Sequence, residues 1–306
     1  MNPVKIIDSR LLDAVSAQAA GSARRRKNFN FHLQDTAPAN RLLNAIEPES
    51  YVQPHRHLDP AKDETLVVLR GAVGLVIFDD KGGIVEQAVL RAGSGALGVD
   101  RVYQRQCRRG VRPGRGLENQ ARRQFNLGTR KMAGTQERPG CVSMNPVKII
   151  DSRLLDAVSA QAAGSARRRK NFNFHLQDAA PANRLLNAME PESYVQPHRH
   201  LDPAKDETLV VLRGAVGLVI FDDKGGIVQQ AVLRAGSGAL GVDIPHATWH
   251  TFVALEPGSV IFEAKAGPYL PLGNGEKAYW APAEGDSAAA VYLERLISSF
   301  HLEVAD

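Results

Sequence analysis

The chain has 306 residues, a net charge of +5 and two cysteines. This length allows two domains of ordinary size, and no stretch reaches the roughly 20 apolar residues of a membrane-spanning helix. The N-terminus contains no apolar signal core, because Ile6 and Ile7 are followed at once by Asp8. The composition therefore predicts a cytoplasmic protein that does not act in a membrane.

Residues 1–100 and 144–243 are almost the same sequence and align without a gap. Solenoid repeats are shorter, roughly 20–50 residues, and more diverged. The pattern therefore indicates a recent tandem duplication, or else an artefact that joins a broken gene copy to an intact one. The differences are Thr36 against Ala179, Ile46 against Met189 and Glu86 against Gln229.

The two copies are not equally long. The first stops matching after Asp100, whereas the second continues to the C-terminus. We interpret residues 1–100 as a truncated duplicate with an incomplete barrel, 101–143 as a linker and 144–306 as the complete domain. Met144 stands where a start codon would be, so two alternatives remain for the product, the whole chain or residues 144–306.

The linker differs in composition from both copies. It holds ten Arg and one Lys against two Glu, together with both cysteines, so the basic charge of the chain resides there. It has no hydrophobic period, which predicts disorder. An Arg-rich tail could bind nucleic acid without sequence preference, but we favour random or frame-shifted coding sequence and expect no specific nucleic-acid partner.

In the intact copy, apolar residues at helical spacing predict a short helix over 150–162, capped by Asp151 or Ser152. The period then changes to that of strands, separated by turn sequences. A second helix is predicted over Ala288–Phe300, with Val291, Leu293, Leu296 and Ile297 toward the barrel. Many short strands without helices between them predict an all-β barrel or jelly roll. The predicted strands are Arg184–Glu190, Tyr194–His200, Thr208–Leu212, Val216–Phe221, Val228–Arg234, Ala239–Val242, Thr248–Ala254 and Ser259–Ala266.

The strongest motif is His198-Arg199-His200, followed by Glu207 and, 43 residues later, by His250. On a strand, residues i and i+2 face the same side, so the two histidines of the pair point together. Three imidazoles and one carboxylate suit one divalent transition metal, Fe, Mn, Ni, Cu or Zn. The alternative, a pair of exposed or structurally satisfied histidines, is weaker because Glu207 and His250 accompany the pair.

These motifs resemble those of the cupins, and more closely those of the WbuC-type cupin-fold metalloproteins. The similarity extends over essentially all of residues 144–306. It rests on Arg167-Arg168-Arg169, Asn173-Phe174-His175, Tyr194 to His200, Glu207-Thr208, Trp249-His250-Thr251, Leu255 to Gly258, Glu263, Gly267-Pro268-Tyr269 and Trp280 to Gly285.

The resemblance implies a double-stranded β-helix barrel with one metal bound by His198, His200, Glu207 and His250. It also implies an association with bacterial surface-polysaccharide synthesis, without fixing the reaction. One departure is His246, where a small residue is expected.

The first copy retains His55, His57 and Glu64 but has no counterpart of His250, because residues 101–143 contain no histidine. We expect weak or no metal binding there. Its unpaired strand edges would invite another chain or aggregation. Completion of the first copy by strands of the second is the alternative.

Basic and polar residues before the first strands form one group of secondary candidates. Arg167, Arg168 and Arg169 could clamp the phosphates of a nucleotide sugar. The alternatives are a solvated basic turn or pairing with carboxylates of the same domain. Asn173 and His175 are expected at the pocket rim, with a purely structural histidine as the alternative.

Later residues supply candidates for catalysis and binding. Glu263 and Lys265 alternate on one strand and could serve as acid and base inside the barrel, or form a structural pair. Trp249 and Tyr269 could stack on a sugar, or pack at the barrel mouth.

The sequence predicts a metal-dependent enzyme that isomerises or epimerises a sugar or sugar nucleotide; a metal dioxygenase belongs to the same class. The alternative is a non-catalytic binding or regulatory cupin with a structural metal. The expected partner is a small molecule, and a homodimer through a barrel edge remains open.

Overall fold

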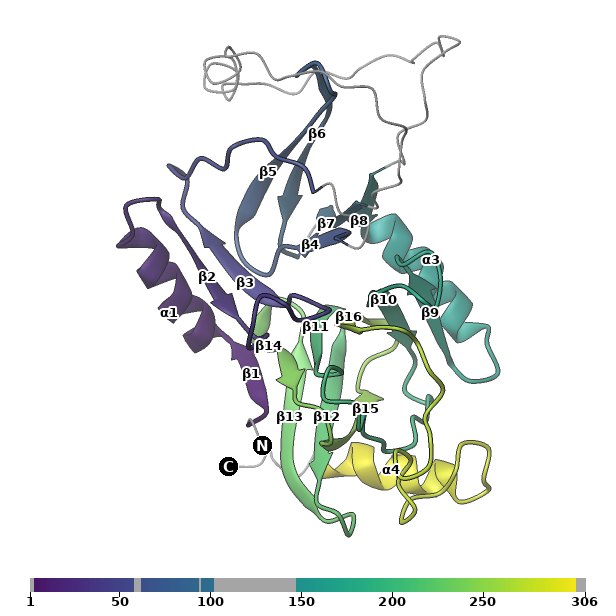
Figure 1. Cartoon of the computed structure of the whole chain (residues 1–306). Coiled ribbons are helices and arrows are strands. Elements are labelled where there is room, and N and C mark those ends of the chain that lie inside the picture. Colours follow the sequence, from purple (N-terminus) through teal and green to yellow (C-terminus); the bar gives the residue numbers. More distant parts are fainter. Residues whose placement is uncertain (1–2, 58–61, 94, 102–146, 301–306) are drawn as a thin grey trace.

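The computed structural model describes residues 3–57, 62–93, 95–101 and 147–300 (Figure 1). Apart from Arg101, the predicted linker lies outside these residues. The first copy contains β1 (Lys5–Asp8), α1 (Ser9–Ala20), β2 (Arg26–Asn30), β3 (Leu42–Ile46), β4 (Glu64–Val67), β5 (Ala72–Phe78), β6 (Ile84–Arg91) and β7 (Ala96–Arg101). The second contains β8 (Lys148–Asp151), α3 (Ser152–Ala163), β9 (Arg169–Asn173), β10 (Ala182–Met189), β11 (Glu207–Arg213), β12 (Ala215–Phe221), β13 (Ile227–Arg234), β14 (Ser237–Ile244), β15 (Trp249–Ala254), β16 (Ser259–Ala266) and α4 (Ala289–Ser299).

The second copy is a curled antiparallel barrel, which confirms the predicted all-β class. Its strands follow the order β15-β12-β13-β14-β11-β16-β10-β9, and β1 of the first copy joins the sheet on β14. The described strands of the first copy form three smaller sheets, β2-β3, β5-β6 and β4-β7, the last of which β8 extends. Figure 1 shows the larger barrel below these smaller sheets.

Burial differs sharply between equivalent positions. Leu66 is 43% exposed in the first copy, whereas the equivalent Leu209 is 3% exposed; Leu42 is 41% exposed against 7% for Leu185. Leu185 and Leu209 lie on strands that flank β16, a strand for which the first copy has no matching sequence. Each Leu buried in full is worth roughly 1.5–3 kcal/mol, so the second copy has the far stronger core.

The two predicted helices of the second copy are present. Asp151 caps α3, because its carboxylate accepts a hydrogen bond from the amide of Leu154 at 3.0 Å. In α4, Leu293 and Leu296 are buried against the barrel, but Val291 is 60% exposed, so its predicted packing was wrong. Within the described residues, no helix combines the length and apolar character needed to cross a membrane.

The prediction of a strand over Tyr194–His200 was also wrong. This segment makes only isolated bridges, from His198 to His250 and to Lys277. Pro197 has no amide hydrogen to donate to a ladder, which keeps the pairing local. The sequence analysis missed β8 and β9, because Lys-Ile-Ile-Asp and Arg-Lys-Asn-Phe-Asn show too few alternating apolar residues to signal a strand.

Gly241 lies where β11 and β14 approach most closely. A Cβ atom built there would stand 2.2 Å from the carbonyl oxygen of Leu209, a backbone atom that cannot move aside freely. We expect Gly241→Ala to lower the free energy of unfolding by about 1–3 kcal/mol, measured by urea denaturation. Gly273→Ala is the control, since its nearest contact would be 3.4 Å away. Equal stability of the two variants would contradict this packing.

Candidate metal centre

Four side chains converge inside the second barrel. His198 and His250 are joined by reciprocal backbone hydrogen bonds, His198 N to His250 O at 3.0 Å and His250 N to His198 O at 2.9 Å. Glu207 is the first residue of β11, opposite Lys265 of β16. His200 follows His198 by two residues. The hydrogen-bonded framework thus brings all four predicted ligands together.

Three of the four predicted ligands lie within reach of a single ion, and His250 adjoins two of them. One ligand atom from each of His198, His200 and Glu207 lies within 4.8 Å of the others. The rings of His198 and His250 are 4.5 Å apart between centroids, and His250 Nε2 is 2.6 Å from Glu207 Oε1. The side chains of His250 and Glu207 are only 2% and 4% exposed. This is a buried cluster with the spacing of a metal site.

The protonation of two histidines follows from their backbone contacts. His198 Nδ1 lies 3.1 Å from the carbonyl of Gln196, and His250 Nδ1 lies 2.9 Å from the carbonyl of Thr248. Because a carbonyl can only accept, each Nδ1 carries the hydrogen, and in the neutral ring Nε2 keeps its lone pair. Burial, and next the nearby His250, holds the pKa of His198 well below its ordinary value, which keeps that ring neutral.

His250 Nε2 and Glu207 Oε1 lie 2.6 Å apart, and neither atom has another hydrogen-bond partner among the described residues. Such a buried contact is favourable when a proton or a metal ion is shared between the two atoms. The donor set therefore fits a divalent transition metal held by His198, His200, Glu207 and His250.

Lys265 and Glu263 extend the cluster. Lys265 Nζ lies 2.7 Å from Glu263 Oε1, 3.5 Å from Glu207 Oε2 and 3.4 Å from His200 Nε2. Burial alone would raise the pKa of Glu207, but the charge of Lys265 and the adjacent histidines outweigh it, so the pKa falls well below its usual range. Burial likewise opposes the charge of Lys265, but its two carboxylate partners raise its pKa.

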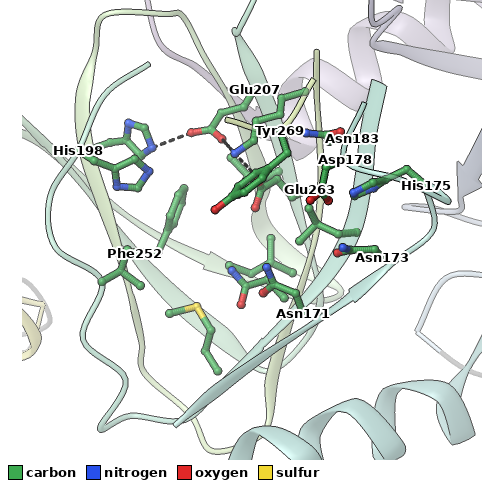
Figure 2. A pocket seen from close by; sticks show the side chains of 18 residues that line it. Asn171, Asn173, His175, Asp178, Asn183, His198, Glu207, Phe252, Glu263 and Tyr269 are labelled. Atoms are coloured by element: carbon green, nitrogen blue, oxygen red, sulfur yellow. Dashed lines mark hydrogen bonds and ion pairs between the residues drawn. The ribbon is translucent and has the colours of Figure 1, made fainter. Parts of the chain in front are cut away.

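A cavity of about 220 Å³ opens onto these groups. In Figure 2, His198 lies at one end and Asn173 and His175 lie at the other. Eighteen residues line it: Asn171, Asn173, His175, Asp178, Asn183, Leu185, Asn187, Met189, Val195, His198, Glu207, Leu209, His250, Phe252, Ile261, Glu263, Lys265 and Tyr269. The lining residues on β9, β10, β11, β15 and β16 are two residues apart along each strand, so one face of each of these strands lines the cavity.

Four asparagines supply a polar part of the cavity lining, and of these only Asn173 was predicted from the sequence. Asn183 and Asn187 of β10 have side-chain oxygens that are buried without a hydrogen-bond partner among the described residues. Asn171 and Asn173 of β9 complete the set. Alternating Asn at i and i+2 was the available signal, but β9 had not been identified as a strand.

Two other histidines lie outside the cluster. His246, the departure from the resemblance, places Nδ1 2.8 Å from Asp206 Oδ1 and is 40% exposed. His175 is buried, lines the cavity, and accepts a hydrogen bond on Nδ1 from the amide of Arg184 at 3.1 Å. This hydrogen bond to the backbone indicates a structural role for His175, although its ring also borders the cavity.

The three candidate arginines all pair with carboxylates of the same domain. Arg167 and Arg169 both contact Glu284, at 2.5 and 2.7 Å, and Arg168 lies 3.2 Å from Glu192. None of the three lines the cavity. This geometry corresponds to the alternative in which the basic run is structural.

Glu284 makes an acid-sensitive contribution to stability. Hydrogen bonds from Arg167, and next from Arg169, lower its pKa to about 2 despite partial burial. A lowered folded-state pKa stabilises the fold above the ordinary value of 4.5, and this contribution is lost as the pH falls toward 2. Glu284→Gln should cost about 0.5–1 kcal/mol at pH 7, discounted for exposure, and nothing near pH 2.

Denaturant unfolding of both proteins across this pH range measures the difference. Glu192→Gln is the control, because the Glu192 side chain is 65% exposed and a smaller effect is expected. A loss for Glu284→Gln that stays constant with pH would contradict the ion-pair origin.

Of the two aromatic candidates, one lies at the cavity. Tyr269 lines it and is 52% exposed. Trp249 is buried, packs against Trp280 and donates its indole hydrogen to Asp223 at 3.0 Å. Its position is that of a packing residue beside the predicted ligand His250.

The equivalent residues of the first copy are arranged more loosely. His57 Nε2 lies 4.0 Å from Glu64 Oε2, and their side chains are 37% and 48% exposed. Among the described residues, only the group in the second copy brings three ligands within metal-binding distance. Exposure to water weakens the field at a cation, so the second copy offers the better site.

The described residues of the second copy form a curled antiparallel barrel that encloses a buried cluster of histidines and one carboxylate. The family model described as "Domain of unknown function (DUF6016)" matches residues 7–90 and 150–233. These ranges cover more than half of the chain, so the chain belongs to this family. The second match includes His198, His200 and Glu207 and ends before His250. No curated protein matches the chain.

Several solved structures are similar to parts of the chain. Procruciferin, the 11S globulin from Brassica napus, is 17% identical over 29% of this chain and 22% of its own, with a TM-score of 0.25. KdgF from Halomonas sp. is 20% identical over 33% of this chain and 82% of its own, with a TM-score of 0.27. A cupin-2 domain protein from Shewanella frigidimarina is 18% identical over 32% of this chain and 80% of its own, with a TM-score of 0.25.

Proposed function

We propose that residues 144–306 bind one divalent transition metal and isomerise or epimerise a sugar or a sugar nucleotide. The observation that carries this proposal is the Glu263–Lys265 pair in the cavity, of which Lys265 Nζ lies 3.4 Å from His200 Nε2 and 3.5 Å from Glu207 Oε2. Burying two charges costs free energy of desolvation, which their pairing offsets only in part. A carboxylate and an ammonium at a metal site are the groups that proton transfer requires.

The roles divide by charge. A bound metal would polarise a carbonyl or hold adjacent hydroxyls of the ligand. Glu263 accepts a proton at Oε1 from the carbon next to that carbonyl. Lys265 holds a proton at Nζ and returns it to the same or the neighbouring carbon. After the first transfer the pair carries one positive charge, which balances the negative charge on the ligand. After the second, a proton passes from Glu263 to Lys265 across the 2.7 Å contact and restores the ion pair.

The polar part of the cavity lining supports a polyhydroxylated ligand. The buried, unpartnered side-chain oxygens of Asn183 and Asn187 can accept hydrogen bonds from hydroxyls. The cavity of about 220 Å³ is below the roughly 300–1,000 Å³ of sites for drug-sized ligands, so it suits one sugar ring. A nucleotide would lie outside. The association with surface polysaccharides rests on the WbuC resemblance alone.

Solvent deuterium incorporation tests this proposal. The metal-reconstituted full chain is incubated in deuterium oxide with aldoses, ketoses and nucleotide sugars, and exchange next to the carbonyl is followed by NMR. We expect exchange that Lys265→Met reduces by a factor of about 100 or more. Lys170→Met, an exposed lysine outside the cavity lining, should not change the rate.

Saturation-transfer NMR in the same samples detects binding. Binding without exchange would favour the non-catalytic alternative. The absence of both would contradict a sugar ligand.

A further inference from the structure

The two copies exchange their N-terminal strands. β1 of the first copy pairs with β14 of the second, with Lys5 opposite Asp243 and Ile7 opposite Gly241. β8 of the second copy pairs with β7 of the first, with Lys148 opposite Asp100. Each strand therefore lies on the barrel of the other copy. Contacts that are the same in both directions are typical of a two-fold interface.

Buried ion pairs repeat this reciprocity. Arg41 of the first copy contacts Asp243, lies 3.3 Å from Asp206 Oδ2, and donates to Thr208 Oγ1 at 2.9 Å. Its side chain is 6% exposed. Removing such charges from water costs several kcal/mol unless every partner is in place, so this contact requires the two copies to be docked.

The mirror network belongs to Arg184 of the second copy. It contacts Asp100, lies 3.0 Å from Asp63 Oδ2, and donates to Thr65 Oγ1 at 2.7 Å. Every member is the counterpart, 143 positions later or earlier, of a member of the Arg41 network. Two independent copies of the same four-residue network define one interface rather than two chance contacts.

A shared hydrophobic core completes the interface. Ile7, Phe31 and Leu97 of the first copy belong to the same buried cluster as Ile150 and Phe174 of the second. Ile7 and Ile150 are both fully buried. A shared apolar core is typical of permanent interfaces, which are more hydrophobic than transient ones.

We propose that the first copy is a built-in partner subunit, and that the surface formed by β1, β7, Arg41 and their counterparts binds a second copy of the same repeat. The first copy thereby closes the edge of β14 that a lone second copy would expose. Arg41 also holds Asp206, the residue before Glu207, and Asp206 accepts the amide hydrogen of His246 at 2.8 Å. Arg41 is therefore a positioning residue for the segments that carry two ligands; this last step rests on the proposed metal site, whereas the pairing does not.

Hydrogen exchange on the full chain tests the pairing without any metal. In the wild type, the amides of Lys5–Asp8 should exchange at least about 10-fold more slowly than an unstructured peptide, together with those of β14. Arg41→Ala and Arg184→Ala should each weaken the docking and speed exchange in both β1 and β8, because the two networks belong to one interface. The β12–β13 hairpin, which neither arginine contacts, is the internal control. Arg41→Gln and Arg184→Gln provide milder variants if alanine prevents folding.

Sedimentation of the wild type separates pairing within one chain from pairing between chains. We expect a monomer at micromolar concentration, because both halves of the interface are satisfied internally. Unprotected β1 amides in the wild type, or a stable dimer of chains, would overturn the proposal. Protection of β1 and β8 that neither arginine variant changes would overturn the assignment of the two networks to this interface.

Discussion

Replacing His250 with alanine should lower the affinity of the chain for a divalent transition metal by more than about 100-fold. Mutating residues that only support a metal ligand typically costs 10–100-fold, and His250 is placed as a ligand itself. Its Nε2 lies 2.6 Å from Glu207 Oε1, so the substitution also removes a contact that holds the carboxylate of Glu207 in place. Competition with a chromophoric chelator measures the affinity.

His246→Ala is the matched control, because it removes an imidazole four residues away that contacts Asp206 instead of the cluster. We expect a much smaller change for this variant. Wild-type affinity in His250→Ala would show that His250 is not a ligand. An equally large loss of metal affinity in His246→Ala would indicate that the conformation of the segment before His250, and not the imidazole of His250, determines the affinity.

Replacing Lys265 with methionine should lower the free energy of unfolding of the metal-free chain by about 3–5 kcal/mol. The substitution removes the cation between Glu207 and Glu263 and leaves two carboxylates buried, with side chains 4% and 11% exposed. Methionine keeps the length and apolar stem of lysine, so the packing loss is small. Guanidinium denaturation at pH 7 measures the effect.

The pH dependence identifies the cause of this loss. In wild type, Lys265 and the histidines lower the pKa of Glu207, so its stabilisation is present at neutral pH and is lost as the pH falls through the carboxyl range. In Lys265→Met the unpaired carboxylates become easier to protonate, so that variant gains stability as the pH falls. The gap between the two proteins should therefore narrow toward pH 4. Lys265→Met combined with Glu263→Gln should recover part of the loss, and a gap independent of pH would contradict an electrostatic origin.

Most strands of the barrel could be predicted from the sequence, because apolar residues in runs or in alternation mark them and turn sequences separate them. Val216–Phe221 and Ser259–Ala266 are apolar runs bounded by glycine or Pro-Gly turns, and both are strands in the structure. β9 was not predicted because Phe172 is its only apolar residue, too few to show an alternating pattern. Tyr194–His200 resembled a strand by composition. A strand also needs a neighbouring strand with which it pairs continuously, and a local sequence pattern does not show whether such a neighbour exists.

The ligand set could be proposed from sequence because His198, His200, Glu207 and His250 combine three imidazoles and one carboxylate in a β-rich chain. The resemblance then implied the same four ligands. The partners of the arginine run could not be foreseen, since Glu284 lies more than a hundred residues from Arg167. The exchange of β1 and β8 was equally hidden. It depends on the contact of Arg41 with Asp243 of the other copy. Because the two copies are nearly identical, their sequences do not show whether a strand pairs within its own copy or with the other one.

Metal content per chain, determined by plasma mass spectrometry on the reconstituted full-length protein, tests the central claim most directly. We predict about one transition-metal ion per chain. It should be retained when His55 and His57 of the first copy are changed to alanine, and lost when His198 and His200 of the second copy are changed. Two ions per chain, or none after reconstitution, would contradict a single metal centre in the second barrel.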